Sequence, residues 1–456
     1  MLGVESEIAK RIAESLQAKL TGQEQQALTV RPTNNPEAYD AYLRGVSFEV
    51  QSGVTIYDYD RNLEEKAAGF YERAVQLDPN FAIAWARLSR LDANLYANSQ
   101  SHTPAPARGD AAKRALETAQ KLDPDSPETL LALGYYRYVV LGDHEAGKTL
   151  LERVRKMWPG NSEVYMAYGR VAREDGLWDQ SIAYYEQCLT LDPRNVGFLM
   201  EAAWTYAMLR RFPDALRLYD RALDILPNNP NVIAAKAGIY QAQGDLQEAA
   251  GLLSGINGQT LSGSAQEVKN VQLRLERNYN ETIRILQARV AQSHFDSQLD
   301  NALTHLGLAH MQWLAGDIAG AKVTAEQGRN TLEQLSKDRP DDWVITEKLS
   351  QLCALMGDKD SALKEAQRAI ALKPTAKDAV TGPGMEENMA FVQMIAGDKR
   401  QAIAIFTRLL NTPYDSRFCT TTTTPALLRL DPIWDPLRAD PDFQKLCQEK
   451  QPPATP

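Results

Sequence analysis

The chain has 456 residues, 44% of them hydrophobic and 8% aromatic, which is typical of a folded protein with two or three domains or one long repeat array. Its 59 acidic and 50 basic residues give a net charge of −9, and Lys and Arg are dispersed along the chain. An acidic surface without a basic patch repels phosphate, so we expect no nucleic-acid partner.

No basic segment followed by an apolar stretch opens the chain, and no apolar run of about 18 residues occurs in it. We therefore expect no membrane contact within this chain and a cytoplasmic location by default. If the chain is cut from a membrane-anchored parent, a periplasmic location is the alternative. The four cysteines lie far apart without a CxxC motif; Cys188 and Cys353 are expected to be buried thiols, and a Cys419–Cys447 disulfide is a minor alternative.

Residues 1–30 are predicted to contain one amphipathic helix at 4–20. Its apolar side chains recur every four residues, at Val4, Ile8, Ile12, Leu16 and Leu20. This stripe has no partner within the first 20 residues. Either it packs on the first repeats, or the sequence is a piece of a longer protein; an unpaired stripe would also suit self-association.

Residues 31–257 contain a repeated pattern, which is clearest between 162 and 229. There two copies of 34 residues follow each other without a gap, SEVYMAYGRVAREDGLWDQSIAYYEQCLTLDPRN and VGFLMEAAWTYAMLRRFPDALRLYDRALDILPNN. Aligned, the copies pair Gly169 with Ala203, Trp178 with Phe212, Ser181 with Ala215, Tyr185 with Tyr219, and Pro193 with Pro227. Earlier copies begin at Pro36, Trp85 and Ser126, and a Ser- and Pro-rich insertion near residue 100 is expected to be a surface loop.

A fixed period of 34 residues with small, aromatic, small and Pro positions at these offsets resembles the tetratricopeptide repeat (TPR). The resemblance implies an all-α fold, a right-handed α-solenoid of about ten antiparallel helix pairs with a concave inner face. Each pair has too little core to fold alone. Small residues let the helices of a pair approach, and aromatic residues fill the space between successive pairs.

Residues 258–415 are predicted to form a degenerate second array. The Gly- and Ser-rich stretch SGINGQTLSGSAQ separates it from the first array, and a well-kept repeat returns at 343–376. Residues 416–456 contain three Asp-Pro pairs and are predicted to form an irregular cap on the last helix, because an open solenoid end exposes apolar surface.

Two motifs that would carry chemistry have a simpler interpretation. Residues 142–149, GDHEAGKT, match the phosphate-binding pattern GxxxxGK[ST], but the match straddles a predicted turn between helices, and Asp143 and Glu145 would repel phosphate. His305 and His310 are five residues apart and so do not share a helix face as a metal-binding pair would. We therefore predict no catalytic site, no metal and no cofactor.

The informative surface is the inner face, which the first helix of each TPR pair lines. The residue types that interfaces favour, Tyr, Trp, Met and Arg, recur at those positions. The predicted groove residues are Tyr135, Tyr138, Met166, Arg170, Arg173, Met200, Trp204, Met208 and Gln241. The alternative is that packing between repeats buries many of them.

A second resemblance concerns both ends. The stretch ESEIAKRIAESLQAKLTGQEQQAL with RPTNNPEAYDAYLRG resembles the junction between a TolB-like region and a TPR array in bacterial signalling proteins, and LLRLDPIWDPLRADPDFQKL resembles their C-terminus. There the array follows a serine/threonine kinase, an adenylate cyclase or a winged-helix regulator. The motifs of those domains do not occur in this chain, so no catalytic residue is carried over.

These observations lead to three hypotheses. The first is a non-enzymatic scaffold that binds a protein or peptide in its concave groove, as the docking or sensory region of a bacterial signal-transduction protein. The second is an assembly module that self-associates into a homo-oligomer through its solenoid ends. The third, an enzyme that uses residues 142–149, is remote.

Overall fold

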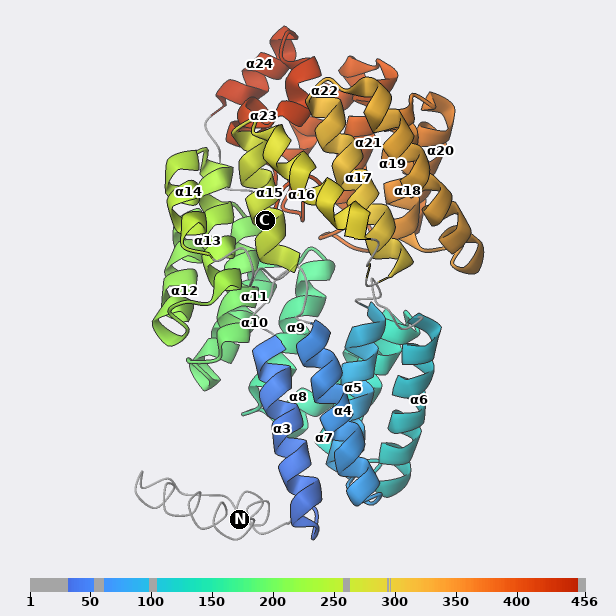
Figure 1. Ribbon diagram of the computed structural model, residues 1–456. Coiled ribbons are helices and arrows are strands. Elements are labelled where there is room, and N and C mark those ends of the chain that lie inside the picture. Colours follow the sequence, from blue (N-terminus) through green and yellow to red (C-terminus); the bar gives the residue numbers. More distant parts are fainter. Residues whose placement is uncertain are drawn as a thin grey trace. The chain divides into compact units, whose positions relative to one another are not determined.

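A computed structural model describes residues 32–52, 61–97, 105–256, 263–292, 295 and 297–449 (Figure 1). The helix predicted at 4–20 and the rest of the segment 1–30 lie outside the described residues. The described residues fall into two compact units, unit 1 up to Val164 and unit 2 from Tyr165 onward, and each is treated by itself below. The boundary expected from the sequence, after residue 257, lies within unit 2.

Every regular element in the described part of the chain is a helix, which confirms the all-α prediction. The helices of unit 1 are α3 (Pro36–Ser52), α4 (Arg61–Leu77), α5 (Ala82–Ala97), α6 (Ala105–Leu122), α7 (Pro127–Tyr135), η1 (Tyr136–Val140) and α8 (His144–Met157). From α9 (Ser162–Glu174), whose first turn belongs to unit 1, unit 2 continues with α10 (Trp178–Leu191), α11 (Val196–Met208), α12 (Phe212–Ile225), α13 (Pro230–Gln243), α14 (Leu246–Ser254), α15 (Gly263–Leu275) and α16 (Tyr279–Gln292). It ends with α17 (Gln298–Leu314), α18 (Ile318–Asp338), α19 (Trp343–Met356), α20 (Lys359–Leu372), α21 (Gly382–Ala396), α22 (Lys399–Leu409), α23 (Pro425–Leu430), η2 (Pro432–Leu437) and α24 (Pro441–Gln448). None of the described helices meets the length and hydropathy needed to cross a bilayer.

The helices follow one another as hairpins because a short turn signal recurs. At five turns the first helix is followed by a glycine with φ between 77° and 102°, a conformation that costs other residues energy. These are Gly176, Gly244, Gly316, Gly357 and Gly397. At four of them an aspartate follows, and its carboxylate accepts the N–H three residues further on, which caps the second helix.

The motif match at residues 142–149 is another turn of this type. Gly142 has a φ of 63°, and the Asp143 carboxylate accepts the Ala146 N–H, 3.3 Å away, to start α8. The helical turn η1 precedes it, so the sequence continues from helix to helix, as the period predicts. No β-strand, which the phosphate-binding motif requires, adjoins this turn.

The small and aromatic positions of the period meet inside each pair. A Cβ atom on Gly169 would lie 2.8 Å from the ring of Tyr185, which is completely buried. Gly45 and Tyr71 repeat this arrangement in unit 1, where the corresponding distance is 2.6 Å. The missing side chain therefore lets the two helices of a pair approach over an aromatic ring.

The C-terminal part of unit 2 differs from the array. Residues 412–424, which we call the inner strap, connect α22 to α23 without regular structure and are mostly buried. After the strap, η2 and α24 pack on the last hairpin through aromatic side chains; the rings of Phe406 and Trp434 lie 4.7 Å apart. The segment from residue 425 thus covers apolar surface of the last hairpin, while the strap turns back toward the first helices of the pairs.

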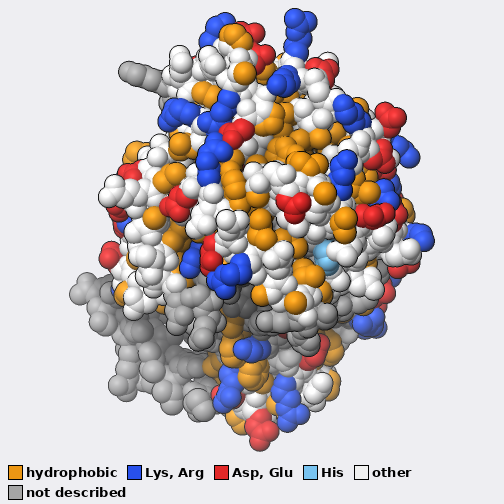
Figure 2. All heavy atoms as spheres, turned by 45° about the horizontal axis from the view of Figure 1, so that its top comes forward, with side chains coloured by type: hydrophobic (Ala, Val, Ile, Leu, Met, Phe, Trp, Pro, Cys, Tyr) orange, Lys and Arg blue, Asp and Glu red, His pale blue; other side chains and the backbone are white. Residues whose placement is uncertain are grey.

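Acidic and basic side chains are mixed on the surface. Figure 2 shows Lys and Arg beside Asp and Glu over the face that it presents, with hydrophobic side chains gathered between them. Large hydrophobic residues that are more than a third exposed include Val50 (51%) on α3 and Val323 (61%) on α18.

Candidate functional site

The predicted groove residues all lie on the first helices of their pairs, which in a TPR line the inner face. Tyr135 and Tyr138 belong to α7 and η1 in unit 1, and the others belong to α9, α11 and α13 in unit 2. They differ in exposure. Half-buried are Tyr135, Tyr138, Met166, Arg170 and Trp204, whereas Arg173, Met200, Met208 and Gln241 are buried.

In unit 2 the structure brings three predicted residues together. Arg170 and Arg173 each place a guanidinium nitrogen 2.8 Å from a carboxylate oxygen of Glu201. The Arg173 guanidinium also lies over the ring of Trp204, 4.3 Å from its centre. A desolvated cation over an indole ring contributes on the order of 2 kcal/mol. The side chains of this patch are therefore held in one arrangement.

Glu201 was not among the predicted residues, although the network depends on it. Burial raises the pKa of its carboxyl, but Arg170 and Arg173 outweigh burial and hold the value at about 2. Its signal in the sequence is that it is the one charged residue of α11, VGFLMEAAWTYAM. A lone acid in an apolar helix needs a basic partner on a neighbouring helix.

The inner face of unit 1 contains a cavity of about 250 Å³. First helices supply most of its lining, and the link before α9 supplies the remainder. The lining residues are Tyr42, Ile83, Ala86, Arg87, Arg90, Glu128, Leu131, Trp158, Asn161 and Glu163. None of them is among the nine predicted groove residues. For the five that precede residue 100, the reason is that the insertion interrupts the period and hides the inner positions of the first two repeats.

A four-membered ion network forms one wall of this cavity. Arg87 lies 3.2 Å from Glu49 and 2.9 Å from Glu163, and Arg90 lies 3.0 and 2.8 Å from the same two carboxylates. Burial raises the pKa of the Glu163 carboxyl, yet the two guanidiniums outweigh it and lower the pKa to about 2. The two positive and two negative charges compensate each other, so the network is close to neutral.

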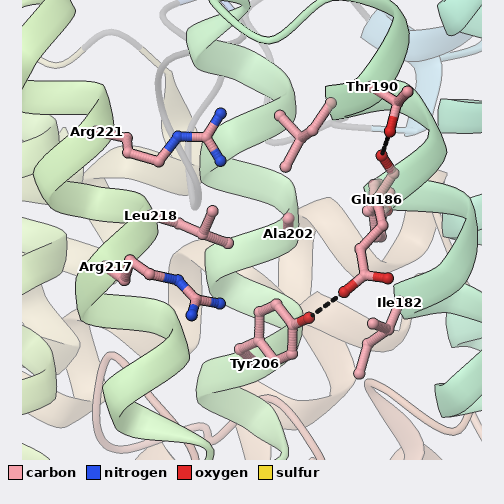
Figure 3. Close-up of a pocket in the computed structure, with 10 residues that line it drawn as sticks. Ile182, Glu186, Thr190, Ala202, Tyr206, Arg217, Leu218 and Arg221 are labelled. Carbon is pink, nitrogen blue, oxygen red and sulfur yellow. Dashed lines mark hydrogen bonds between the residues drawn. The ribbon is translucent and has the colours of Figure 1, made fainter.

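A second cavity, of about 300 Å³, lies between α10, α11 and α12 in unit 2. Figure 3 shows Arg217, Leu218 and Arg221 on α12 facing Ile182 and Glu186 on α10. The Tyr206 hydroxyl donates to Glu186 over 3.0 Å, and burial followed by this bond raises the pKa of Tyr206 to about 12. Two of its three helices are second helices of their pairs, so this cavity is not part of the predicted groove.

The other candidate residues occupy packed positions. Cys188, Cys353, Cys419 and Cys447 are buried free thiols, as expected for the first two, and the minor disulfide alternative is not formed. His305 and His310 are both 8% exposed. Among residues that the structure describes, no three or more His, Cys, Asp or Glu side chains are grouped as metal ligands.

Comparison with known proteins supports the repeat. Tetratricopeptide-repeat models match residues 136–195 and 169–230, and a further one matches 207–266, so the chain contains TPR repeats. No curated protein matches the chain. The similarity to TolB-like signalling proteins has no support from these comparisons and stays a prediction.

Several solved structures are similar to parts of the chain. Human IFIT1, solved as a dimer with PPP-AAAA, is 15% identical over 81% of this chain and 78% of its own, with a TM-score of 0.39. PilW, a type IV pilus biogenesis factor, is 16% identical over 51% of this chain and 99% of its own, with a TM-score of 0.36. YrrB, a TPR protein with an unusual peptide-binding site, is 20% identical over 45% of this chain and 92% of its own, with a TM-score of 0.26.

Proposed function

We propose that this chain is a non-enzymatic interaction scaffold that binds a protein or peptide partner on the inner face formed by its first helices. The observation that carries the proposal is the cavity of about 250 Å³ in unit 1. TPR repeats generally mediate protein–protein interaction, and pockets lined by apolar and aromatic side chains with a few fixed polar groups are typical binding sites.

The lining of the unit 1 cavity indicates what it would hold. Ile83, Leu131 and the ring of Trp158 supply apolar surface, and Trp158 is half-buried. The charges of Arg87 and Arg90 are compensated by Glu49 and Glu163, and burial raises the pKa of the third carboxyl of the site, that of Glu128. The cavity therefore offers little positive charge to an anionic ligand. We therefore expect an apolar or aromatic side chain of the partner to enter the cavity as an anchor.

The half-buried predicted residues of unit 2 form a separate candidate surface within that unit. Arg170 and Trp204 are held by the Glu201 network, and a fixed side chain loses little conformational entropy when a partner binds. Met166 lies on the same helix as Arg170 and adds an adaptable apolar contact.

The proposal is tested by selecting binders to the full chain from a random peptide library displayed on phage. We expect the selected peptides to share an aromatic or large aliphatic residue. Trp158→Ala should weaken their binding at least tenfold, because it removes one side of the cavity. Met157→Ala is the matched control, since Met157 is 43% exposed next to Trp158 and does not line the cavity.

Equal loss of binding in both variants, or no loss in either, would contradict the proposal. Light scattering on the same samples separates it from self-association. If peptide binding is seen only in samples in which light scattering shows a dimer, the inner face is an assembly surface instead.

We propose further that the scaffold is the docking or sensory region of a bacterial signal-transduction protein. This rests on the similarity of both ends of the chain to the TolB-like/TPR arrangement. Sequencing the gene upstream of Met1 tests it: a kinase, cyclase or winged-helix domain is expected there, and an upstream stop codon would contradict it.

A further inference from the structure

The inner strap, residues 412–424, is unusual for a buried segment because it is rich in hydroxyl groups. Tyr414 and Thr422 are completely buried, and Thr421, Thr423 and Thr424 are at most 4% exposed. Burying a hydroxyl without a hydrogen bond costs free energy. The strap also lacks the regular backbone bonds of a helix, so its partners must come from the helices around it.

One buried carboxylate on α21 accepts three of the strap's hydroxyl groups. Glu387, which is completely buried, accepts the Tyr414 hydroxyl at 2.9 Å and the Ser416 hydroxyl at 2.7 Å. It also accepts the Arg417 backbone N–H at 2.7 Å, and the Thr423 hydroxyl. A single side chain on a first helix therefore binds hydroxyl groups near both ends of the strap.

Arginines from other hairpins donate hydrogen bonds to backbone carbonyls of the strap. Arg210, at the turn after α11, donates to the carbonyl oxygens of Thr412 and Thr423 over 3.0 and 2.9 Å. Arg274 on α15 donates to the carbonyl of Phe418 and is paired with Asp431 over 2.8 Å. Contacts to main-chain carbonyls hold a segment by its backbone, whatever its side chains are.

Two first helices carry glycine where the strap crosses them. A Cβ atom on Gly384 of α21 would lie 2.7 Å from the carbonyl oxygen of Asp415. A Cβ atom on Gly238 of α13 would lie 2.9 Å from the Thr420 hydroxyl. Both helices thus leave room for a chain running over them, as a peptide groove does.

One residue of the strap is poorly accommodated. Asp415 is half-buried; its Oδ2 lies 3.7 Å from a guanidinium nitrogen of Arg417, but its buried Oδ1 has no hydrogen-bond partner among the described residues. Burial raises the pKa of this carboxyl to about 7; Glu267 and Glu387 add to the shift, while Arg417 and Arg173 oppose it. A buried acceptor without a partner disfavours the bound state. A segment that keeps the hydroxyls and lacks this acid would occupy the site better.

We propose that the inner face of unit 2 is a binding site for a polypeptide segment with hydroxyl side chains and no regular structure. In the resting chain the strap occupies this site, and a partner segment with a neutral residue at the position of Asp415 displaces the strap. This proposal rests on the proposed function, because both place a partner on first helices, but it concerns a different surface from the unit 1 cavity.

The test uses the full chain and a fluorescein-labelled synthetic peptide of residues 410–425 carrying Asp415→Asn. The strap variant Tyr414→Phe/Ser416→Ala/Thr423→Val weakens the resident segment and leaves Glu387, Arg210 and Arg274 in place. The peptide should bind this variant at least tenfold more tightly than the unchanged chain. Thr407→Val, which alters an exposed hydroxyl on α22, should bind it no better than the unchanged chain.

Hydrogen exchange of the strap amides shows whether the strap leaves its site by local opening or only when the whole chain unfolds. Exchange of the strap that is faster than global unfolding, without saturable peptide binding, would overturn the proposal. Exchange only through global unfolding in the strap variant would also overturn it, because the strap would then be a permanent part of the core. If the triple variant does not fold, Asp415→Asn in the full chain is expected to slow strap exchange at pH 8, and unchanged or faster exchange would refute the proposal. Trp158→Ala should leave peptide binding unchanged, which separates this site from the unit 1 cavity.

Discussion

Arg210 and Arg277 take the left-handed backbone conformation that glycine takes at the other hairpin turns. Among the described residues they are the non-glycine residues with positive φ, at 58° and 59°. For a residue with a Cβ this conformation costs roughly 1–2 kcal/mol. Both side chains reach the C-terminal part of unit 2: Arg210 contacts the strap, and Arg277 pairs with Asp435 over 2.6 Å. Strain at these turns therefore coincides with contacts that glycine could not make.

The two arginines make a matched pair of substitutions. Arg210→Gly relieves the strain but removes buried bonds from a charged group, each worth about 1.5–3 kcal/mol, so we expect a net loss of roughly 2–4 kcal/mol in the free energy of unfolding. Arg277→Gly removes an exposed ion pair worth about 0–1 kcal/mol and should be neutral or stabilising. Urea denaturation of both variants measures the difference, and an equal effect would contradict the assigned role of Arg210.

His310 is a buried base within the core of unit 2. Burial lowers the pKa of its imidazole to about 3, and Arg274 and Lys348 add to the effect. The unfolded chain takes up this proton near pH 6.5, so the native state loses stability as pH falls from 6.5 toward 3.

For His310→Leu we expect this part of the acid sensitivity to disappear. At pH 4.5 the wild-type chain should have lost about 2–3 kcal/mol relative to pH 7 through His310 alone. Denaturant unfolding of both proteins across this range measures it. Parallel pH profiles for the two proteins would show that His310 is not buried as a neutral base.

At the scale of elements, helices α21 and α14 each contain a glycine for which we predict opposite effects of substitution by alanine. Gly384 on α21 faces the strap carbonyl of Asp415, whereas a Cβ atom on Gly251 of α14 would meet no other atom within 4 Å. Gly384→Ala should destabilise the chain by about 1–3 kcal/mol through overpacking. Gly251→Ala should stabilise it by up to about 1 kcal/mol, since alanine favours the helix. Thermal unfolding compares the stability of the two variants. If both are more stable than the unchanged chain, the strap does not pack against α21 at Gly384.

The helix pairs were predictable because their determinants are local. The Gly-Asp turns, the small positions and the buried tyrosines recur in the sequence at the period itself, and the comparison with TPR models confirms the repeats at 136–266. The position of the strap was not predictable. The run of threonines at 420–424 has no periodicity, and its partners Glu387 and Arg210 are 36 and 213 residues away from Thr423.

The residues of the candidate site were likewise predictable only where the repeat period is regular. Counting positions within the gapless repeats placed Arg170, Arg173 and Trp204 on one inner face, and the structure joins them in one network. Counting missed Glu201, which lies one position beyond those considered. It also missed Arg87 and Arg90, because the insertion near residue 100 breaks the 34-residue period from which inner positions are counted.

At the scale of the whole molecule, the two units use their inner faces differently. In unit 1 the first helices enclose a cavity beside a compensated ion network. In unit 2 the chain's own strap is contacted by Glu387 and Arg274 on first helices and by Arg210 at the turn after α11. One repeat pattern therefore gives two inner faces with different chemistry, a cavity with mixed apolar and charged lining and a buried polar site occupied by a segment of the chain itself.

The most direct measurement is hydrogen–deuterium exchange of the full chain with and without a peptide selected on it. Binding to the inner face of unit 1 predicts slower exchange in α3, α5 and α7, around Tyr42, Arg90 and Leu131, with α4, α6 and α8 little changed. Slower exchange confined to α4, α6 and α8, with the first helices unchanged, would contradict the claim that the inner face is the binding surface.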